Sequence, residues 1–375
     1  MKTFKTIRMG FLAAAAALVC FSSCSSDDDQ QSGGNPAPQR ESLVVLTINT
    51  GKMMSRAAGT TTTLTDNEKH IEDLTVGIFD NTGKKRIVRS FKAAELVTTP
   101  GSSKAEVKIF ATDLTITDEV VVVANTNEKQ GALEAAATKD AFNQVTLESA
   151  KAVVKDSKLL PKYGETKLTQ GNLPTTFKAD VKVKNLVSRV TLNHLDVQLP
   201  NGANFEVSDI YLTHLPKNFA YSQTGWVDGL TDPKNDFIHG IFSKADNTTE
   251  GDPNLHKAVT AAGENSFLYT TPNKVQTGNN TRLVLKGKFT PNTGANAEVV
   301  YYALPLNVSI VDGTYDSADG EAMVFATSPG KNYKCNVTIK KKGSDDPWDA
   351  TQPQVAEINV EAENWVDVEQ NTTFQ

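Results

Sequence analysis

Cysteine is scarce in this sequence: Cys20, Cys24 and Cys335 are the only three in 375 residues. Cys20 lies in an apolar run near the N-terminus, and Cys24 closely follows that run. The remainder of the chain therefore has a single cysteine, which excludes an internal disulfide and a cysteine metal cluster. Its stability must come from hydrophobic burial, and the chain is long enough for two domains that each bury a core.

The residue patterns that usually carry catalysis are also missing. The five histidines are scattered without a helical zinc spacing, and there is neither a glycine-rich phosphate loop nor a nucleophile elbow. The net charge of −6 comes without a basic block, so nothing favours nucleic acid. We expect no catalytic residue, metal, cofactor or enzymatic activity, although carboxylate pairs assembled by the fold stay open. His194 and His214 lie in strand-like runs and are expected to be structural.

The N-terminal hydrophobic run is too short for a permanent transmembrane helix, which needs about 20 apolar residues. The run Phe11–Val19 follows three basic residues, and small residues lead from it to Cys24. This order predicts a lipoprotein signal peptide over residues 1–23 and acylation of Cys24. An ordinary signal peptide cleaved nearby is the alternative. The polar, acidic stretch after Cys24 suits a lipidated N-terminus that a solvated tether holds off the membrane.

The rest of the chain has the patterns of a β protein. Thr, Val and Asn are abundant, and short runs alternate between apolar and polar residues, which predicts strands with one wet face. We expect an all-β fold of two antiparallel sandwiches in tandem, with domains at residues 57–180 and 181–375. The predicted strands are Leu74–Phe79, Ala105–Phe110, Val120–Ala124, Ser188–Val197, Phe205–Leu212, Thr281–Phe289 and Tyr333–Ile339.

One stretch of the first domain departs from this pattern. Helix formers with apolar spacing near three and four run from Ala132 to Val153 and predict one or two short helices. Further on, Gln170–Pro174 interrupts the periodicity, so a linker between the domains is expected within Lys167–Ala179.

The two ends of the exported chain carry strands of similar character. In Ser42–Gly51, the side chains of Val44, Leu46 and Ile48 fall on one face and two more apolar residues fall on the other, which predicts a strand buried on both faces. Near the C-terminus, Val355–Glu369 alternates in the same way, with apolar residues Ile358, Val360, Ala362, Trp365, Val366 and Val368.

This pairing of ends permits exchange between copies. A cut after Arg56 would untie the first strand, and its departure would expose an apolar groove and two rows of unpaired backbone groups. The C-terminal strand of another copy could fill the groove by β-strand addition. Repetition of that head-to-tail contact gives an open filament.

The chain resembles the fimbrillins of the Bacteroidales, FimA-type major fimbrial subunits, with the minor fimbrillins as the next nearest match. The resemblance extends over nearly the whole chain, in the order and spacing of several segments. These segments are the lipobox cysteine Cys24, Leu46–Ala57, Leu74–Asp80, Val121–Thr126, Ser188–Thr191, Lys331–Ile339 and Asn364–Phe374.

The resemblance implies a structure and a route of assembly. Each domain would be a transthyretin-like sandwich, and the lipidated precursor would reach the outer membrane before an arginine-specific protease cuts it at Arg56–Ala57. Residues 24–56 would then be a propeptide with the removable strand, and residues from about 355 to 375 the donor strand. The product would be a cell-surface fimbria that supports adhesion and colonisation. Its partners would be other copies, accessory fimbrial subunits and receptors on host or bacterial surfaces.

Several alternatives stay open at this point. Arg40 is a rival cut site, but it precedes the strand, so cleavage there would leave the groove filled. A shaft subunit needs both a removable and a donating strand, and this chain has candidates for both, whereas an anchor or a tip could lack one. A surface glycan-binding lipoprotein is a different class with the same export signal. Asp316-Ser317-Ala318 resembles a short O-glycosylation sequon, with a plain polar loop as the other interpretation.

Overall fold

The computed structural model describes most of the chain after residue 40. It covers residues 41–49, 61–63, 66–98, 104–126, 128–148, 159–222, 238–239, 267–273, 281–292, 296–306, 308–311, 314–317, 327–347 and 350–366. Cys24, Arg56, Ala57 and Val368 lie outside these ranges. Within them, no helix is long and apolar enough to cross a membrane.

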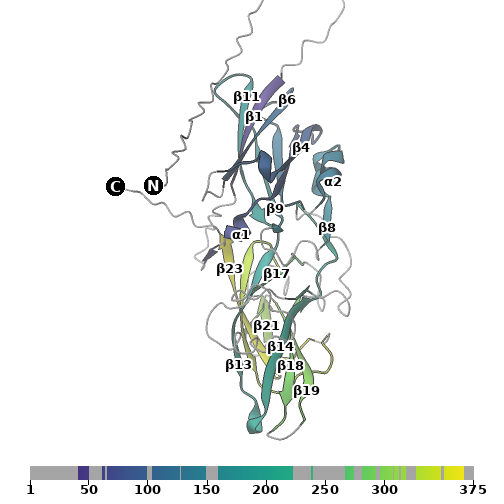
Figure 1. Cartoon of the computed structure of the whole chain (residues 1–375), viewed down its shortest axis with the longest axis vertical. Helices are drawn as coiled ribbons and strands as arrows, with labels where there is room; N and C mark the ends of the chain where they lie inside the picture. Colours follow the sequence, from purple (N-terminus) through teal and green to yellow (C-terminus); the bar gives the residue numbers. More distant parts are fainter. Residues whose placement is uncertain are drawn as a thin grey trace, which may run out of the picture. The chain divides into compact units, whose positions relative to one another are not determined.

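Two sheets from the first half of the chain pack around one core. The first has the order β10-β11-β1-β6-β5 and the second β12-β9-β7-β3-β4, and Figure 1 shows β1 beside β11 and β6. The bounds of the first sheet are β1 Glu41–Asn49, β5 Val97–Thr98, β6 Lys104–Thr112, β10 Thr169–Gln170 and β11 Thr176–Lys182. Those of the second are β3 Asp73–Phe79, β4 Lys85–Lys92, β7 Glu119–Ala124, β9 Lys162–Lys167 and β12 Lys184–Asn185.

The unbroken apolar run of β7 has a structural reason, since both of its faces are buried. Val120 and Val122 point into the core between the two sheets. Val121 and Val123 lie in a second cluster with Leu133 and other apolar residues. A strand covered on both sides needs no polar alternation.

Two short helices follow β7, as the sequence predicts. They are α2 (Gln130–Ala135) and α3 (Lys139–Asn143), and each buries one apolar side chain, Leu133 and Phe142. The Phe142 ring meets the ring of Phe79 edge to face, with centroids 5.6 Å apart. Thr138 caps α3, because its hydroxyl accepts a hydrogen bond from the Ala141 amide.

The second half of the chain forms another sandwich, with β2 of the first half added to one of its sheets. Its sheets have the orders β17-β13-β22-β23-β2 and β16-β14-β18-β19, and their inward side chains form one core. The bounds are β2 Thr61–Thr63, β13 Ser188–Val197, β14 Asn204–Thr213, β16 Ile238–His239, β17 Phe267–Thr270, β18 Arg282–Thr290, β19 Glu298–Pro305, β22 Lys331–Ile339 and β23 Ala356–Val366. The all-β fold with short helices in the first half is confirmed.

The linker expected within Lys167–Ala179 is wrong. That stretch forms the β10–β11 hairpin of the first sheet, and the Gln170 side chain bonds the backbone oxygens of Leu173 and Thr176 across its turn. The chain passes to the second pair of sheets after β12, between Asn185 and Ser188. The residues that break the periodicity are turn residues within a sheet.

The expectation of purely antiparallel sheets also needs correction. β1 runs parallel to β11, β13 parallel to β22, and β2 parallel to β23. Each of these pairs joins strands far apart in sequence, so no tight hairpin fixes their relative direction.

Segments from both halves meet in a shared buried region. The short strands β8 (Thr146–Glu148) and β15 (Asn218–Ala220) pair with each other, and Phe219 and Tyr221 lie in the same apolar cluster as Leu133 and Phe142. The Tyr221 hydroxyl donates to the Thr126 carbonyl oxygen at 2.5 Å. The helix α1 (Asp66–Lys69) also contacts the second half, as described below.

Candidate assembly site

The predicted removable strand is β1, and it occupies an interior position in its sheet. It pairs antiparallel with β6 from Glu41 to Asn49 and parallel with β11 from Leu43 to Asn49. A strand with two neighbours has its backbone groups engaged on both sides. Its removal would therefore leave unpaired groups on two strands.

The inward side chains of β1 belong to the core. Val44, Leu46 and Ile48 are each 0% exposed and contact the same cluster as Val107 and Ile109 of β6. Its outward side chains are only half-buried, which differs from the expected burial of both faces. The outer face of this sheet even leaves Phe110, opposite Leu43, 54% exposed.

The predicted donor strand is β23, and most of it is paired with β22 in the second pair of sheets. It pairs antiparallel with β22 along Ala356–Asn364, and Ile358 and Val360 lie in the core of the second pair of sheets. Ala362, Trp365 and Val366 are also part of β23, but only their backbone is described. Val368 lies outside the described residues.

The end of β23 has a second neighbour on its other side. The strand β2 pairs parallel with it, through Thr61 with Asn364 and Thr63 with Val366. β2 thus lies at the edge of the sheet, only a few residues after the predicted cut. The sequence does not predict this pairing, because three consecutive threonines have no pattern that would set a register.

A buried ionic cluster holds the segment that follows β2. Glu68 of α1 is 0% exposed, accepts two hydrogen bonds from the Arg189 guanidinium and accepts another from the Tyr269 hydroxyl at 2.7 Å. Arg189 and Tyr269 are also buried, on β13 and β17. A buried carboxylate needs such hydrogen-bond partners, because it has lost its contacts with water. This cluster ties α1 to the second pair of sheets.

The same segment is bound to the first pair of sheets by Lys162 and Asn125. Both side chains donate to the carbonyl oxygens of His70 and Leu160, over 2.9 to 3.2 Å. Burial lowers the pKa of Lys162 to about 7, while the charge of Glu68 acts in the opposite direction. Residues 66–73 are therefore fixed to both halves of the chain.

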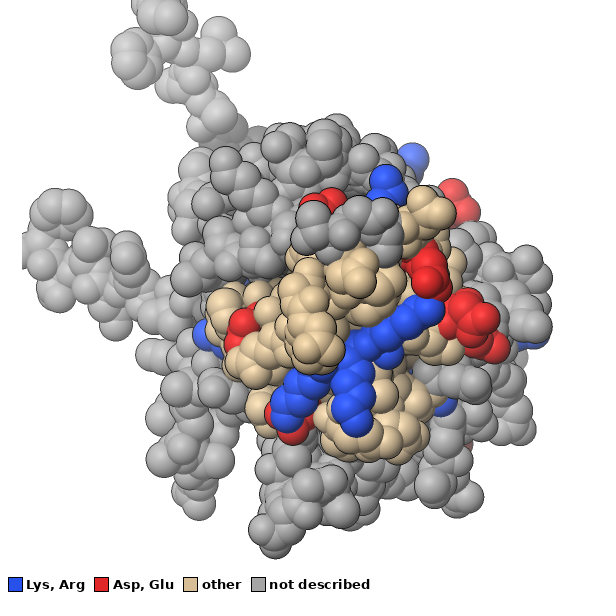
Figure 2. Space-filling view, turned by 90° about the horizontal axis from the view of Figure 1, so that it is seen from below, with Lys and Arg blue, Asp and Glu red and all other residues tan. Residues whose placement is uncertain are grey.

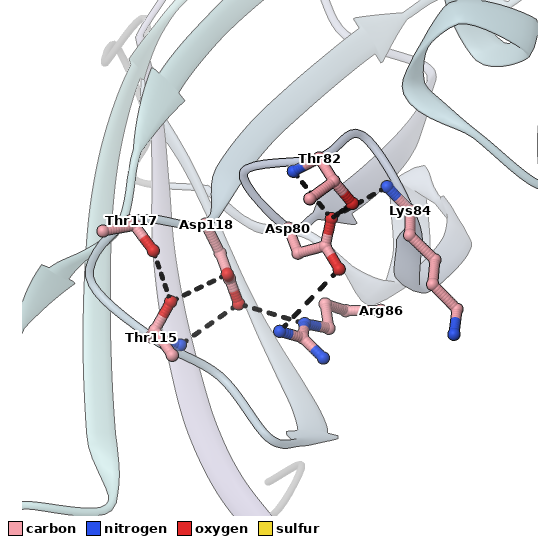
Figure 3. A network of polar contacts seen from close by, with 7 residues as sticks. All are labelled: Asp80, Thr82, Lys84, Arg86, Thr115, Thr117 and Asp118. Atoms are coloured by element: carbon pink, nitrogen blue, oxygen red, sulfur yellow. Dashed lines mark hydrogen bonds and ion pairs between the residues drawn. The ribbon is translucent and has the colours of Figure 1, made fainter.

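A polar network at two turns of the first sandwich is structural. Figure 3 shows Arg86 between Asp80, which follows β3, and Asp118, which precedes β7. Asp118 is buried and accepts from the amide and the hydroxyl of Thr115. Hydrogen bonds from the hydroxyl of Thr82 and the amide of Lys84 lower the pKa of Asp80. Every described oxygen of this network serves a turn or an ion pair.

The two histidines expected to be structural differ from each other. His194 is exposed on β13. His214 is buried with a positive φ of 60°, and its Nδ1 lies 3.0 Å from the Thr213 hydroxyl. Burial first, and then the charge of Arg282, lower the pKa of His214 to about 4. Burial likewise raises the pKa of Cys335.

Charged side chains of both signs gather on one face of the molecule. Figure 2 shows Lys and Arg side chains at the centre of this face with Asp and Glu beside them. In the second sandwich, Lys340 pairs with Glu357 and Lys342 with Glu298. Among the described residues, no group of three or more His, Cys, Asp and Glu side chains could hold a metal ion.

Solved structures share the fold over almost their whole length. A fimbrilin (FimA) of Porphyromonas gingivalis W83 matches with a TM-score of 0.56 and 16% identity, over 88% of this chain and 99% of that one. A putative cell adhesion protein of Bacteroides eggerthii matches with a TM-score of 0.57 and 19% identity, over 89% and 99%. Another from Parabacteroides distasonis has a TM-score of 0.59 and 12% identity, over 88% and 99%.

Sequence comparison points in the same direction over the first half. No curated protein sequence matches the chain. Residues 42–194, which include β1 except Glu41 and the other strands of the first sandwich, match the family model of the major fimbrial subunit protein (FimA). The resemblance to the FimA-type fimbrillins is therefore confirmed, by a family match over residues 42–194 and by a fold shared over most of the chain.

Proposed function

We propose that this protein is the shaft subunit of a cell-surface fimbria. It is exported as a lipoprotein through Cys24, reaches the outer membrane as a lipidated precursor, and is cut by an arginine-specific protease between Arg56 and Ala57. Released copies then polymerise by donor-strand exchange. The observation that carries the proposal is the interior place of β1 between β6 and β11, a few residues before Arg56.

Burial explains why the strand stays in place until it is cut and why the empty groove must be refilled. Val44, Leu46 and Ile48 are fully buried. Burying three aliphatic side chains of this size contributes on the order of 5–9 kcal/mol. An empty groove would expose that apolar surface together with the backbone edges of β6 and β11, and both favour a replacement strand.

The donor is proposed to be the end of the chain. Donation of Ile358 and Val360 requires opening the core of their own sandwich, because both are buried there. We therefore assign the donated part to residues 361–375, which include Ala362, Trp365, Val366 and Val368. The domain limits at 57–180 and 181–375 remain proposals, although β11 ends at Lys182 and β12 (Lys184–Asn185) also belongs to the first pair of sheets. The strand β2 is a segment of the first domain that pairs in a sheet of the second.

Cleavage of the purified precursor tests this function. An arginine-specific protease is expected to give a new N-terminus at Ala57 and, on unheated gels, a ladder of polymers. Arg56→Ala should stay a monomer, while Arg40→Ala should be cut and polymerise normally. If wild-type protein with an intact tail is cut after Arg56 and stays monomeric, strand exchange is wrong.

A fimbrial anchor or tip is the second candidate within the family. An anchor would keep its first strand, and a tip would not donate its last one. Two solved structures of fimbrial tip and assembly proteins match only with TM-scores of 0.48 and 0.43, so they carry no argument for those roles. Sequencing the N-terminus of the protein on the cell surface separates shaft from anchor, since only the shaft form begins at Ala57.

A further inference from the structure

The strand β2 lies between the proposed cut and the proposed donor. It begins at Thr61, five residues after Arg56, and pairs with Asn364–Val366 at the end of β23. Asn364 is engaged on both sides, with Lys331 of β22 on one and Thr61 on the other. The backbone of this end of β23 is thus already paired within its own copy.

β2 is attached to fixed points at both of its ends. Downstream, Glu68 is buried with Arg189 and Tyr269 in the second pair of sheets. Upstream, residues 50–60 connect β2 to Asn49, the last residue of β1, which pairs with Lys104 and Lys182. Arg56 lies in that upstream connection.

A cut in residues 50–60 changes the free energy of separating β2 from β23. While both ends are held, β2 gains less conformational freedom on separating from β23 than a chain with a free end would, because its loop stays closed. After the cut it has a free end only a few residues away, and a three-residue strand next to a free end frays.

We propose that β2 is a guard strand, which keeps the end of the donor strand paired within its own copy until the chain is cut after Arg56. The proposal rests on the function proposed above. One cleavage then has two effects: it frees β1 from its place between β6 and β11, and it weakens the pairing of β2 with the end of β23. A precursor with a filled groove accordingly does not offer its tail to another copy.

Hydrogen exchange in the uncut protein tests the guard strand without any polymerisation. In an Arg56→Ala background, Thr61, Thr62 and Thr63 are all changed to proline, which removes the amide donors of β2. The matched control changes the same three residues to alanine and keeps every amide. Amides of residues 364–366, which pair with β2, should exchange roughly tenfold faster in the proline variant, the factor for losing one or two backbone hydrogen bonds. Amides of β1 should be unchanged, which also shows that the variant is folded.

A second measurement needs no substitution at all. Wild-type protein cut after Arg56, diluted until gel filtration shows monomer, should show the same faster exchange at residues 364–366 as the proline variant. Equal exchange in the proline and alanine variants, or in cut and uncut protein, overturns the guard strand. Faster exchange without polymers from cut protein would instead uphold the guard strand and overturn strand exchange.

Discussion

Glu68 is the residue on which contacts between the two halves converge. Its carboxylate is fully buried and bound by Arg189 and Tyr269, and the carbonyl oxygen of His70, directly after its helix, is bound by Lys162 and Asn125. Removing one partner of a buried ion pair leaves the other charge uncompensated. Loss of Glu68 would therefore weaken the joint between the two halves.

We expect Glu68→Gln to lower the free energy of unfolding by about 3–5 kcal/mol, since it leaves Arg189 buried without its carboxylate. Urea denaturation of the Arg56→Ala protein measures the change. Glu72→Gln is the control, because Glu72 is exposed and pairs only with His70 among its described ion pairs, at 3.0 Å. That surface pair should contribute less than about 1 kcal/mol. Equal effects of the two substitutions would contradict a special role for Glu68.

His214 should make stability depend on pH. Its pKa is about 4 in the folded chain and 6.5 in the reference state, so the unfolded chain binds more protons between these values. Stability then rises with pH from about 4 to 6.5, by at most about 3 kcal/mol. His214→Asn keeps a residue that tolerates positive φ and should flatten that part of the curve. The same change at the exposed His194 serves as the control in urea titrations at several pH values.

At the scale of elements, the burial of β1 in the core is what its proposed removal after the cut would undo. Leu46→Ala should cost about 2–5 kcal/mol in the uncut protein, because it opens a cavity between the first two sheets. Thr47→Ala, whose side chain points to the half-buried outer face, should cost much less. Thermal unfolding of both variants in the Arg56→Ala background measures the difference, and similar losses would place Leu46 outside the core.

Truncation separates the two parts of the tail. Removal of residues 367–375 should leave the fold intact, since every residue of β23 remains. Removal of residues 356–375 should unfold the second sandwich, because Ala356, Ile358 and Val360 are part of its core. Circular dichroism and limited proteolysis distinguish the outcomes. A folded protein after the longer truncation would show that β23 is dispensable to its own sandwich.

The sequence predicts β3, β6, β13, β14, β18 and β22 because apolar and polar side chains alternate along them, and it predicts β1 for the same reason. It predicts β7 from an unbroken apolar run instead. Pairing is different, since parallel partners such as β1 and β11 lie more than 120 residues apart and no hairpin links them. The bond between Arg189 and Glu68 spans 121 residues and leaves no periodic trace in the sequence.

For the whole molecule, loss of β1 should behave as the loss of a bound ligand. Cut protein freed of its first strand should unfold at a lower temperature, and an added peptide of residues 41–56 should restore the temperature in proportion to the logarithm of its concentration. A peptide with Leu46→Ala should restore less at the same concentration. Calorimetry of the cut, tail-truncated protein is the measurement. No effect of the wild-type peptide would mean that the groove collapses once it is empty.

The edge of the second sheet is closed by the chain itself. Along β4, the Ser90 amide donates to the Glu134 carboxylate, the Lys85 amide donates to the Ala137 carbonyl oxygen, and Lys84 pairs with Thr138. Free edges are where sheets of separate molecules pair by accident. Because α2 and its flanks cover this edge, a second copy cannot pair with β4 there. In the proposed fimbria, this contact would prevent side branches from starting at β4.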